Sequence, residues 1–448
     1  MPRRTQNRTI FADLFGNHIA LLSERYERLL QREQIDVLAI HSGQVKRQFL
    51  DDMEYPFKVN PHFKAWCPLL DAPNCWLLIR PGKKPVLVFH STEDFWTQQG
   101  RIDDEFWLPR FHVELISTPD AIDQHLPYDK ARCVYLGEHI EVALALGIEE
   151  VNPEPVMSYL HYHRLFKTDY EQACLREANA IAIQGHEAAE AAYFSGESEF
   201  GCWLAYIQAT GQGPNEVPYD HIIGHNEHAA ILHYSVQSRQ VIAENQRRSM
   251  MIDAGANCRG YAADISRTYA WQEGDFAQLI RAVDGLSREL AGKATPGTTF
   301  AQLHEQAHLS LAQILKDFGL VNMQPQEMIE NQVTSVFMPH GLGHMLGLQV
   351  HDVGGNLADE RGLVVSPPDL FPTLKTTRKI EPGQVFTIEP GLYFIEPLLQ
   401  RLANTRAGQK INWKRVDEFR PYGGIRIEDN IIIHRDRNEN LTREQGLA

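Results

Sequence analysis

Four acidic residues and one histidine occur in strand-like or glycine-rich segments, where exposed charge is not normally placed. They are Asp253, Asp264, His344, Glu389 and Glu428. Burying a lone carboxylate is costly, so carboxylates within apolar runs are expected to be paired or metal-bound. For any one of them, an acid at a strand end that faces water or an arginine remains an alternative. Together they form a mostly oxygen ligand set, which suits a pair of divalent ions such as Mn²⁺ better than a thiolate-bound zinc ion.

The strand that carries Glu428 also carries a cation. Because side chains alternate along a strand, Arg426 and Glu428 should face one side, and Ile425 and Ile427 the other. One face would then bury apolar bulk while the opposite face presents a cation beside an acid. A structural ion pair between Arg426 and Glu428 is an alternative explanation of this spacing.

Histidines cluster in the second half of the chain, at His225, His228, His233, His340, His344 and His351. His340 and His344 are four residues apart, but Gly341 and Gly343 argue against a helix that displays both on one face. A glycine-rich loop that lets the backbone approach a ligand fits better. Spacing alone leaves open which imidazole binds metal. The chain has no G-x-S-x-G, P-loop or H-E-x-x-H motif.

The N-terminal part that precedes these residues has an alternating pattern. Apolar residues at helical spacing predict a helix over residues 11–34, and short apolar runs predict strands at 37–40, 75–79, 85–89 and 133–137. This alternation predicts one α/β domain over residues 1–165. Thr168, with Glu171 three residues later, has the spacing of a capping box and marks the start of a long helix.

The pattern changes over residues 166–448, which we expect to form a second domain. Helical spacing predicts helices at 168–194, 198–210, 275–294 and 299–318. Strands are expected at 218–223, 229–234, 250–256, 260–269, 385–395 and 424–434. Strands with helices grouped beside them indicate an α+β fold class.

Composition excludes several classes of protein. Of the 448 residues, 43% are hydrophobic and 23% charged, which is typical of a globular chain rather than a disordered one. The net charge of −15 disfavours nucleic-acid and anionic membrane partners. No apolar run could span a membrane, and the basic N-terminus lacks the apolar region of a secretory signal. Six scattered cysteines suit reduced thiols, so we expect a cytoplasmic location.

These motifs resemble those of the prolidases (Xaa-Pro dipeptidases) of the pita-bread metallopeptidase superfamily. The similarity is closest to the bacterial branch that includes the organophosphorus acid anhydrolases. Matching blocks occur at 232–234, 252–268, 340–352 and 387–391 with 424–429, and the block from His340 to Asp352 is the most specific. The stretch from His41 to Trp66 resembles the bacterial branch in particular. The resemblance implies an N-terminal α/β domain and a C-terminal pita-bread domain, assembled as a homodimer.

The resemblance also assigns roles to individual residues. It implies that Asp253, Asp264, His344, Glu389 and Glu428 hold two divalent ions, Mn²⁺ with Co²⁺ as an alternative, and that Asp264 and Glu428 bridge them. The implied catalytic residues are Glu389, His351 and Arg426, and the implied substrate-binding residues are His233, His340, Tyr219 and Lys375. The family usually has an arginine at the position of Lys375, where it holds the dipeptide's carboxylate. Lysine supplies the charge without the bidentate geometry.

The expected reaction is hydrolysis of the peptide bond in X-Pro dipeptides by a water activated between the two ions. A side activity on organophosphorus triesters and fluoridates is implied, because the same nucleophile can attack phosphorus. Two alternatives remain open. One is an aminopeptidase that cleaves longer X-Pro peptides, and the other is a non-enzymatic binding module with the same fold.

Overall fold

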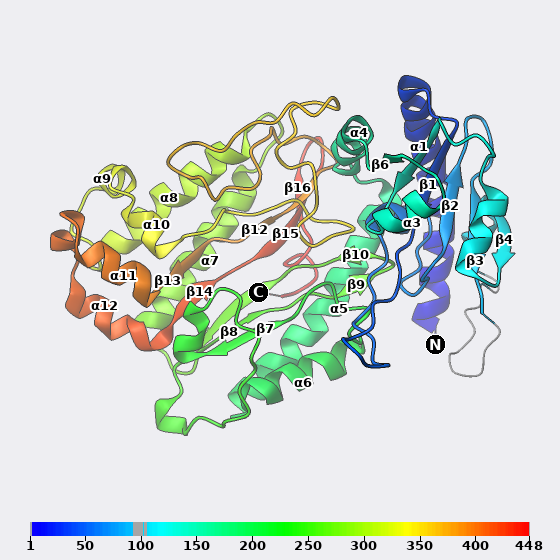
Figure 1. Cartoon of the computed structure of the whole chain (residues 1–448). Helices are drawn as coiled ribbons and strands as arrows, with labels where there is room; N and C mark the ends of the chain where they lie inside the picture. The colour runs from blue at the N-terminus through cyan, green and yellow to red at the C-terminus, as the bar shows by residue number, and fades with distance from the viewer. Residues whose placement is uncertain (1, 93–101, 103–104, 448) are drawn as a thin grey trace.

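A six-stranded sheet organises the N-terminal part of the chain (Figure 1). The computed structural model describes residues 2–92, 102 and 105–447. The sheet order is β4-β3-β2-β1-β5-β6, and the strands are β1 (Val37–His41), β2 (Trp76–Ile79), β3 (Val86–His90), β4 (His112–Ile116), β5 (Cys133–Leu136) and β6 (Glu150–Val151). Strand β1 pairs antiparallel with β2 and parallel with β5. The four strands predicted from sequence in this part are confirmed, while β4 and β6 were not predicted.

Helices pack around this sheet. They are α1 (Pro2–Glu33), α2 (Pro61–Lys64), α3 (Ile140–Ala145) and α4 (Glu154–Arg164), with the 3-10 helices η1 (Leu108–Arg110) and η2 (Pro119–His125). Helix α1 confirms the predicted helix and begins earlier in the chain. Its apolar stripe buries Phe15, Leu22 and Leu29, as the helical spacing of these residues requires.

Two helices open the C-terminal part, α5 (Asp169–Phe194) and α6 (Glu199–Thr210). The predicted capping box is present: the Thr168 side chain accepts from the Glu171 N–H, and the Glu171 carboxylate accepts from the Thr168 N–H. Ser198 caps α6 in the simpler way, by accepting from the Gly201 N–H. The local sequence therefore determines where both helices begin.

Short strands in four small sheets form the middle of the C-terminal part. The strands are β7 (Ile222–His225), β8 (Ser249–Asp253), β9 (Asn257–Cys258), β10 (Tyr261–Ala262), β11 (Ser266–Ala270), β12 (Val385–Ile388), β13 (Gly391–Tyr393), β14 (Gly424–Arg426), β15 (Asp429–Ile433) and β16 (Asn438–Asn440). The sheet orders are β11-β8-β7, β12-β15-β16, β13-β14 and β10-β9. A single bridge between Ser266 and Glu428 joins the first of these sheets to the strands near the C-terminal end.

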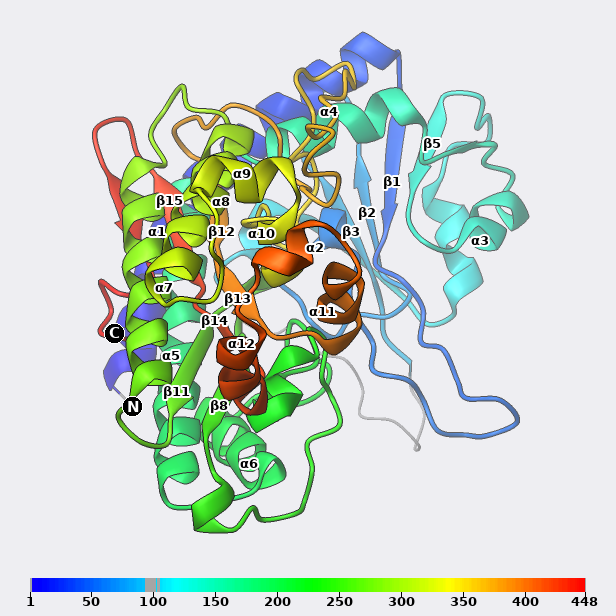
Figure 2. The same ribbon diagram turned by 90° about the vertical axis from the view of Figure 1, so that its left-hand side faces the viewer.

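The strands lie between two helix pairs (Figures 1 and 2). Helices α5 and α6 pack on one side, against β9, β10 and β7, and α7 (Asp275–Lys293) packs on the other side with α8 (Phe300–Asp317). Smaller helices complete the second side: α9 (Pro325–Glu330), α10 (Val333–Phe337), α11 (Glu396–Ala403), α12 (Trp413–Phe419), η5 (Ala407–Lys410) and η6 (Arg420–Tyr422). The four long helices predicted from sequence are all present.

One apolar cluster joins the two parts of the chain. It contains Phe15 and Leu29 of α1 together with Tyr261, Leu348 and Ile432 from the C-terminal part. The N-terminal part therefore packs against the segment that carries the glycine-rich loop. Among the described residues, no helix has both the length and the apolarity that crossing a membrane requires.

The structure differs from the sequence-based expectations at two kinds of place. Residues 229–234, predicted as a strand, instead form the end of the 3-10 helix η3 (Asn226–Ala230) and an irregular stretch after it. They have no strand pairing, so that prediction is wrong. Three predicted long strands are each interrupted, and the interruptions fall at Asp264, Glu389 and Glu428. At each interruption the acidic residue lies between two shorter strands, and all three carboxylates line the same cavity.

Candidate metal centre

All five residues predicted as metal ligands line one cavity of about 270 Å³. The cavity wall also contains five of the other predicted site residues: His233, His340, His351, Lys375 and Arg426. Tyr219 reaches the same place, because its hydroxyl hydrogen-bonds to two of the five candidate ligands. The structure thus brings together every residue that the sequence analysis assigned to the site.

The glycine-rich loop is held against β12 at the point where it delivers His344. The His344 N–H donates to Thr387 Oγ1 at 3.0 Å, and the Thr387 N–H donates to the His344 carbonyl at 2.9 Å. A Cβ atom at Gly343 would lie 2.1 Å from the Thr387 carbonyl oxygen. Only glycine permits this approach at position 343. The predicted absence of a helix here is confirmed, and the backbone that Gly343 approaches is that of β12.

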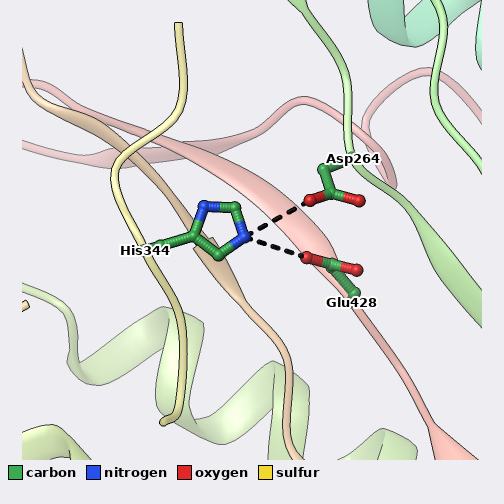
Figure 3. Close-up of side chains that lie close together, drawn as sticks. All are labelled: Asp264, His344 and Glu428. Carbon is green, nitrogen blue, oxygen red and sulfur yellow. Dashed lines mark ion pairs between the residues drawn. The ribbon is translucent and has the colours of Figure 1, made fainter. Parts of the chain in front are cut away.

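Three of the five side chains point at one another (Figure 3). Nε2 of His344 lies 3.3 Å from Oδ2 of Asp264 and 3.9 Å from Oε1 of Glu428. It is also 3.5 Å from Oε1 of Glu389. One ligand atom from each of Asp264, His344 and Glu428 lies within 4.8 Å of the others, which is the spacing of donors around a shared ion.

Asp253 lies at the end of β8 and forms the opposite edge of this group. Its Oδ2 accepts from Arg426 Nη2 at 2.8 Å. The Tyr219 hydroxyl lies 2.8 Å from Oδ1 of Asp253 and 2.6 Å from Oδ1 of Asp264, so one proton is shared between two carboxylates. The predicted strand parity is confirmed, since Arg426 and Glu428 both face the cavity while Ile425 and Ile427 are buried in the apolar core. The suggested pairing of Arg426 with Glu428 is wrong, because the arginine pairs with Asp253.

The electrostatics of these buried carboxylates favour a bound cation. Burial raises the pKa of Asp253 to about 7, and the nearby Arg426 only partly offsets that effect. Burial, together with Asp264 and Glu389, raises the pKa of Glu428 well above its usual range. For Asp264 the effect of burial is outweighed by the hydrogen bond from His344, which lowers the pKa of that carboxyl.

One oxygen in this group has no hydrogen-bond partner within the described part of the chain. Oε1 of Glu428 is buried without a hydrogen bond, while Oε2 accepts from Ser266 Oγ at 2.8 Å. A buried carboxylate oxygen that lacks a donor costs free energy unless a cation binds it. The residues present therefore fit a divalent cation, for which Asp264, His344 and Glu428 offer closely spaced donor atoms and Asp253 and Glu389 offer further carboxylates at the same cavity.

A hydrogen-bonded chain supports the wall beside the carboxylates. Nδ1 of His340 donates to the Gly341 carbonyl at 2.8 Å, so Nε2 accepts from the Tyr393 hydroxyl at 3.0 Å. That hydroxyl in turn accepts from Arg426 Nη1 at 3.2 Å. Burial lowers the pKa of His340, so the imidazole is neutral at neutral pH.

His351 and Lys375 form the other side of the cavity. The His351 ring packs edge-on against His344, with 4.2 Å between centroids. Burial, His344 and Lys375 lower the pKa of His351 to about 4, so it is neutral at neutral pH. Nζ of Lys375 lies 3.3 Å from Nδ1 of His351. If Nδ1 accepts from the ammonium, Nε2 carries the proton and can donate it into the cavity.

Three supporting residues were missed by the sequence analysis. Thr387 anchors the loop of His344, Ser266 donates to Glu428, and Tyr393 connects His340 to Arg426. Ser266 and Thr387 each lie two residues from a candidate ligand, a spacing that could have indicated a shared face. No pattern in the sequence pointed to Tyr393.

Comparison with known proteins identifies the family. Residues 13–162 match the family described as Xaa-Pro dipeptidase, N-terminal domain, and residues 173–435 match Metallopeptidase family M24. Xaa-Pro dipeptidase 1 of Idiomarina loihiensis is 56% identical over 434 residues, covering 97% of this chain and 96% of that relative. This chain belongs to the Xaa-Pro dipeptidases of metallopeptidase family M24.

A second relative supports the same family assignment. The Xaa-Pro dipeptidase of Pseudoalteromonas atlantica is 52% identical, with 97% of this chain and 99% of the relative covered. This chain is therefore a metal-dependent hydrolase, and the alternative of a non-enzymatic binding module is wrong.

Solved structures confirm the fold. A histidine-to-alanine variant of Escherichia coli aminopeptidase P superposes with a TM-score of 0.72 at 22% identity, covering 97% of this chain and 95% of that chain. Proline aminopeptidase P II from Yersinia pestis superposes with a TM-score of 0.70 at 24% identity, covering 97% of this chain and 96% of that chain. The predicted α+β class, with an N-terminal domain followed by a pita-bread domain, is confirmed.

Proposed function

We propose that this chain hydrolyses the peptide bond of X-Pro dipeptides with a dinuclear metal centre. The observation that carries the proposal is the intact set of four carboxylates and one imidazole around a cavity of about 270 Å³, in a chain 56% identical to an Xaa-Pro dipeptidase. A small cavity that recognises both ends of a dipeptide explains how a tertiary prolyl amide, which lacks an N–H, is accepted. We place the boundary between the two domains at residues 165 and 166.

Asp253, Asp264, His344, Glu389 and Glu428 would hold the two ions. When bound, the ions would lower the pKa of the attacking water and polarise the scissile carbonyl. The oxygen-rich donor set supports Mn²⁺, with Co²⁺ as an alternative. Because these ligands must be deprotonated, metal binding competes with protons at Asp253, whose pKa is about 7.

Three residues would act on the substrate's reacting atoms. Glu389 would accept a proton from the attacking water and return it to the prolyl nitrogen as the C–N bond breaks. The neutral His351 would donate its Nε2–H to the developing oxyanion. Arg426 uses four of its five N–H groups, on Ser266, Tyr393, Leu232 and Asp253, so one N–H remains for the substrate.

Other residues of the cavity would bind the two ends of the dipeptide. Lys375 places an ammonium group at the cavity wall, where it would pair with the carboxylate of the proline. His233 and His340 line the wall on the side of Arg426, and Tyr219 closes the space beside Asp253. Lysine pairs with a carboxylate as a point charge, so this contact should be weaker than a bidentate arginine contact.

Activity on Gly-Pro and Ala-Pro, before and after metal removal, tests the proposal. The expected result is hydrolysis that is lost on chelation and restored by Mn²⁺. Full activity in protein shown to be metal-free would refute the mechanism. Ala-Pro-Ala and longer peptides separate the dipeptidase from the alternative of an aminopeptidase, which would cleave the longer peptides at least as well.

We further propose a side activity on organophosphorus triesters and fluoridates, because the same activated water can attack a phosphorus centre. Release of fluoride from a phosphofluoridate by the Mn²⁺-loaded protein would support it. Release that persists in Asp264→Asn, after dipeptide hydrolysis has been lost, would show that the two reactions do not share a centre.

We also propose that the chain is a cytoplasmic homodimer. The support for dimerisation is a loop with apolar side chains in solvent: Phe49 and Leu50 are each 90% exposed, and Met53 is 63% exposed. Exposed apolar groups that cluster on one loop are typical of an interaction site. Light scattering of the purified protein should give the mass of a dimer, and Phe49→Asp with Leu50→Asp should shift it towards the monomer.

A further inference from the structure

Glu199, outside the metal site, is a buried carboxylate with an unusual number of donors. The residue is the first of α6 and is 2% exposed. Its Oε1 accepts from the His225 N–H at 2.8 Å and from His228 Nδ1 at 2.7 Å. Its Oε2 accepts from the Tyr234 hydroxyl at 2.8 Å and from the Ser238 N–H at 2.7 Å. Hydrogen bonds to a charged acceptor are stronger than those between neutral groups.

Two partners of Glu199 lie before a segment without regular structure, and the other two lie within it. Residues 231–238, which we call the His233 segment, contain no helix or strand, so few backbone hydrogen bonds hold them. At the start of the segment, the Leu232 carbonyl accepts from Arg426 Nη2 at 3.3 Å. At its end, the Ser238 N–H donates to Glu199, and the Ser238 carbonyl accepts from the Phe200 N–H at 3.1 Å.

His233 lies between two anchored residues. Leu232 is held by Arg426, and Tyr234 is held by Glu199. The Tyr234 ring also stacks on His228, with 4.5 Å between centroids, and His228 itself hydrogen-bonds to Glu199. The His233 side chain lines the cavity and forms no hydrogen bond of its own with the described residues. Its position therefore depends on its two neighbours.

We infer that Glu199 and Tyr234 are positioning residues that hold His233 at the substrate cavity. Without the Tyr234 anchor, the segment would have more conformations, and ordering it on binding would cost conformational entropy. The inference rests on the proposed dipeptidase function, in which His233 contacts the substrate away from the scissile bond. Losing the anchor should therefore weaken substrate binding more than it slows the chemical step.

Tyr234→Phe is the test, because it removes one hydroxyl and leaves Glu199 with three hydrogen bonds. We expect the KM for Ala-Pro to rise roughly fivefold, with kcat within about twofold of the wild type. Tyr193→Phe is the matched control. The Tyr193 hydroxyl is buried near His225 but has no hydrogen-bond partner in the described part of the chain, so its removal should leave both constants unchanged.

A double-mutant cycle separates positioning of His233 from a general structural role. In a His233→Ala background, Tyr234→Phe should raise KM no further, because the anchor then has no side chain to position. An equal rise in both backgrounds would overturn the inference, as would a fall in kcat with KM unchanged.

Hydrogen exchange of the metal-loaded protein tests the anchoring independently of activity. Amides of residues 231–238 should exchange faster in Tyr234→Phe, while those of α6 keep the wild-type rate. Unchanged exchange in residues 231–238 would refute the inference. A wild-type protein with no activity on X-Pro dipeptides would instead refute the proposed function, and the exchange result would still decide whether Tyr234 anchors the segment.

Discussion

Asp352→Asn should destabilise the protein strongly, although Asp352 is not a candidate metal ligand. The carboxylate is buried directly after His351 and accepts from Arg164 at the end of α4 and, at 3.1 Å, from Lys167 in the connection to α5. All three side chains are at most 7% exposed. The asparagine variant would retain the shape of the side chain but leave two buried cations without their counter-ion.

The pKa of Asp352 gives the size of the effect. Burial acts to raise it, but Arg164 and Lys167 lower it from 3.8 to about 2. At about 1.36 kcal/mol per pKa unit, the ionised form stabilises the fold by roughly 2 kcal/mol. Removing one partner of a buried pair also leaves uncompensated charge, so the total loss should be about 3–5 kcal/mol.

Urea unfolding of wild type and Asp352→Asn at several pH values is the assay. Because the folded pKa is depressed, the stabilisation is complete above the unfolded pKa of 3.8 and disappears as the pH falls through about 2. The difference between the two proteins should therefore be constant from pH 8 to 5 and shrink below pH 4. Glu273→Gln is the control, since its pair with Arg281 is exposed and should contribute less than about 1 kcal/mol. A loss for Asp352→Asn no larger than that of the control would refute the reasoning.

Three further predictions concern the metal site. Glu428→Gln should lower the bound metal measured by elemental analysis and reduce kcat by more than about a hundredfold, whereas retained metal and activity would exclude Glu428 as a ligand. The pKa of Asp253 is about 7, so the affinity for Mn²⁺ measured by calorimetry should fall as the pH drops from 8 to 6. Protons should be released on binding. An affinity that does not change with pH would contradict this prediction. Lys375→Arg should lower the KM for Ala-Pro several-fold through a bidentate contact with the carboxylate, and an unchanged KM would show that this residue does not hold the substrate.

The parts of the fold that local sequence determines were predictable. Thr168 with Glu171 forms the expected capping box, and Arg426 and Glu428 share a face because strand geometry requires it. The five candidate ligands could be selected because carboxylates in apolar runs are unusual, and the structure places all five at one cavity. These features depend on residues close together in the chain, where spacing and side-chain chemistry are sufficient evidence.

Features that depend on distant residues were not predictable from spacing. The apolar residues at 229–234 are compatible with a strand, but the carboxylate of Glu199, more than twenty residues earlier, holds the segment in an irregular conformation. The partner of Arg426 is Asp253 rather than Glu428, because the position of β14 relative to β8 brings that carboxylate closer. Tyr393 was missed for the same reason, since its role exists only after β13 and β14 pair.

The interrupted strands have a consequence for how the protein matures. Asp253 and Glu428 are separated along the chain by α7, α8 and the whole glycine-rich loop, and Asp264, His344 and Glu389 come from three separate places between them. All five candidate ligands therefore come together only when these distant segments have packed against one another. Ion uptake at the proposed centre would follow tertiary assembly and would stabilise the native state by mass action. Metal content of freshly synthesised protein would then report completed folding.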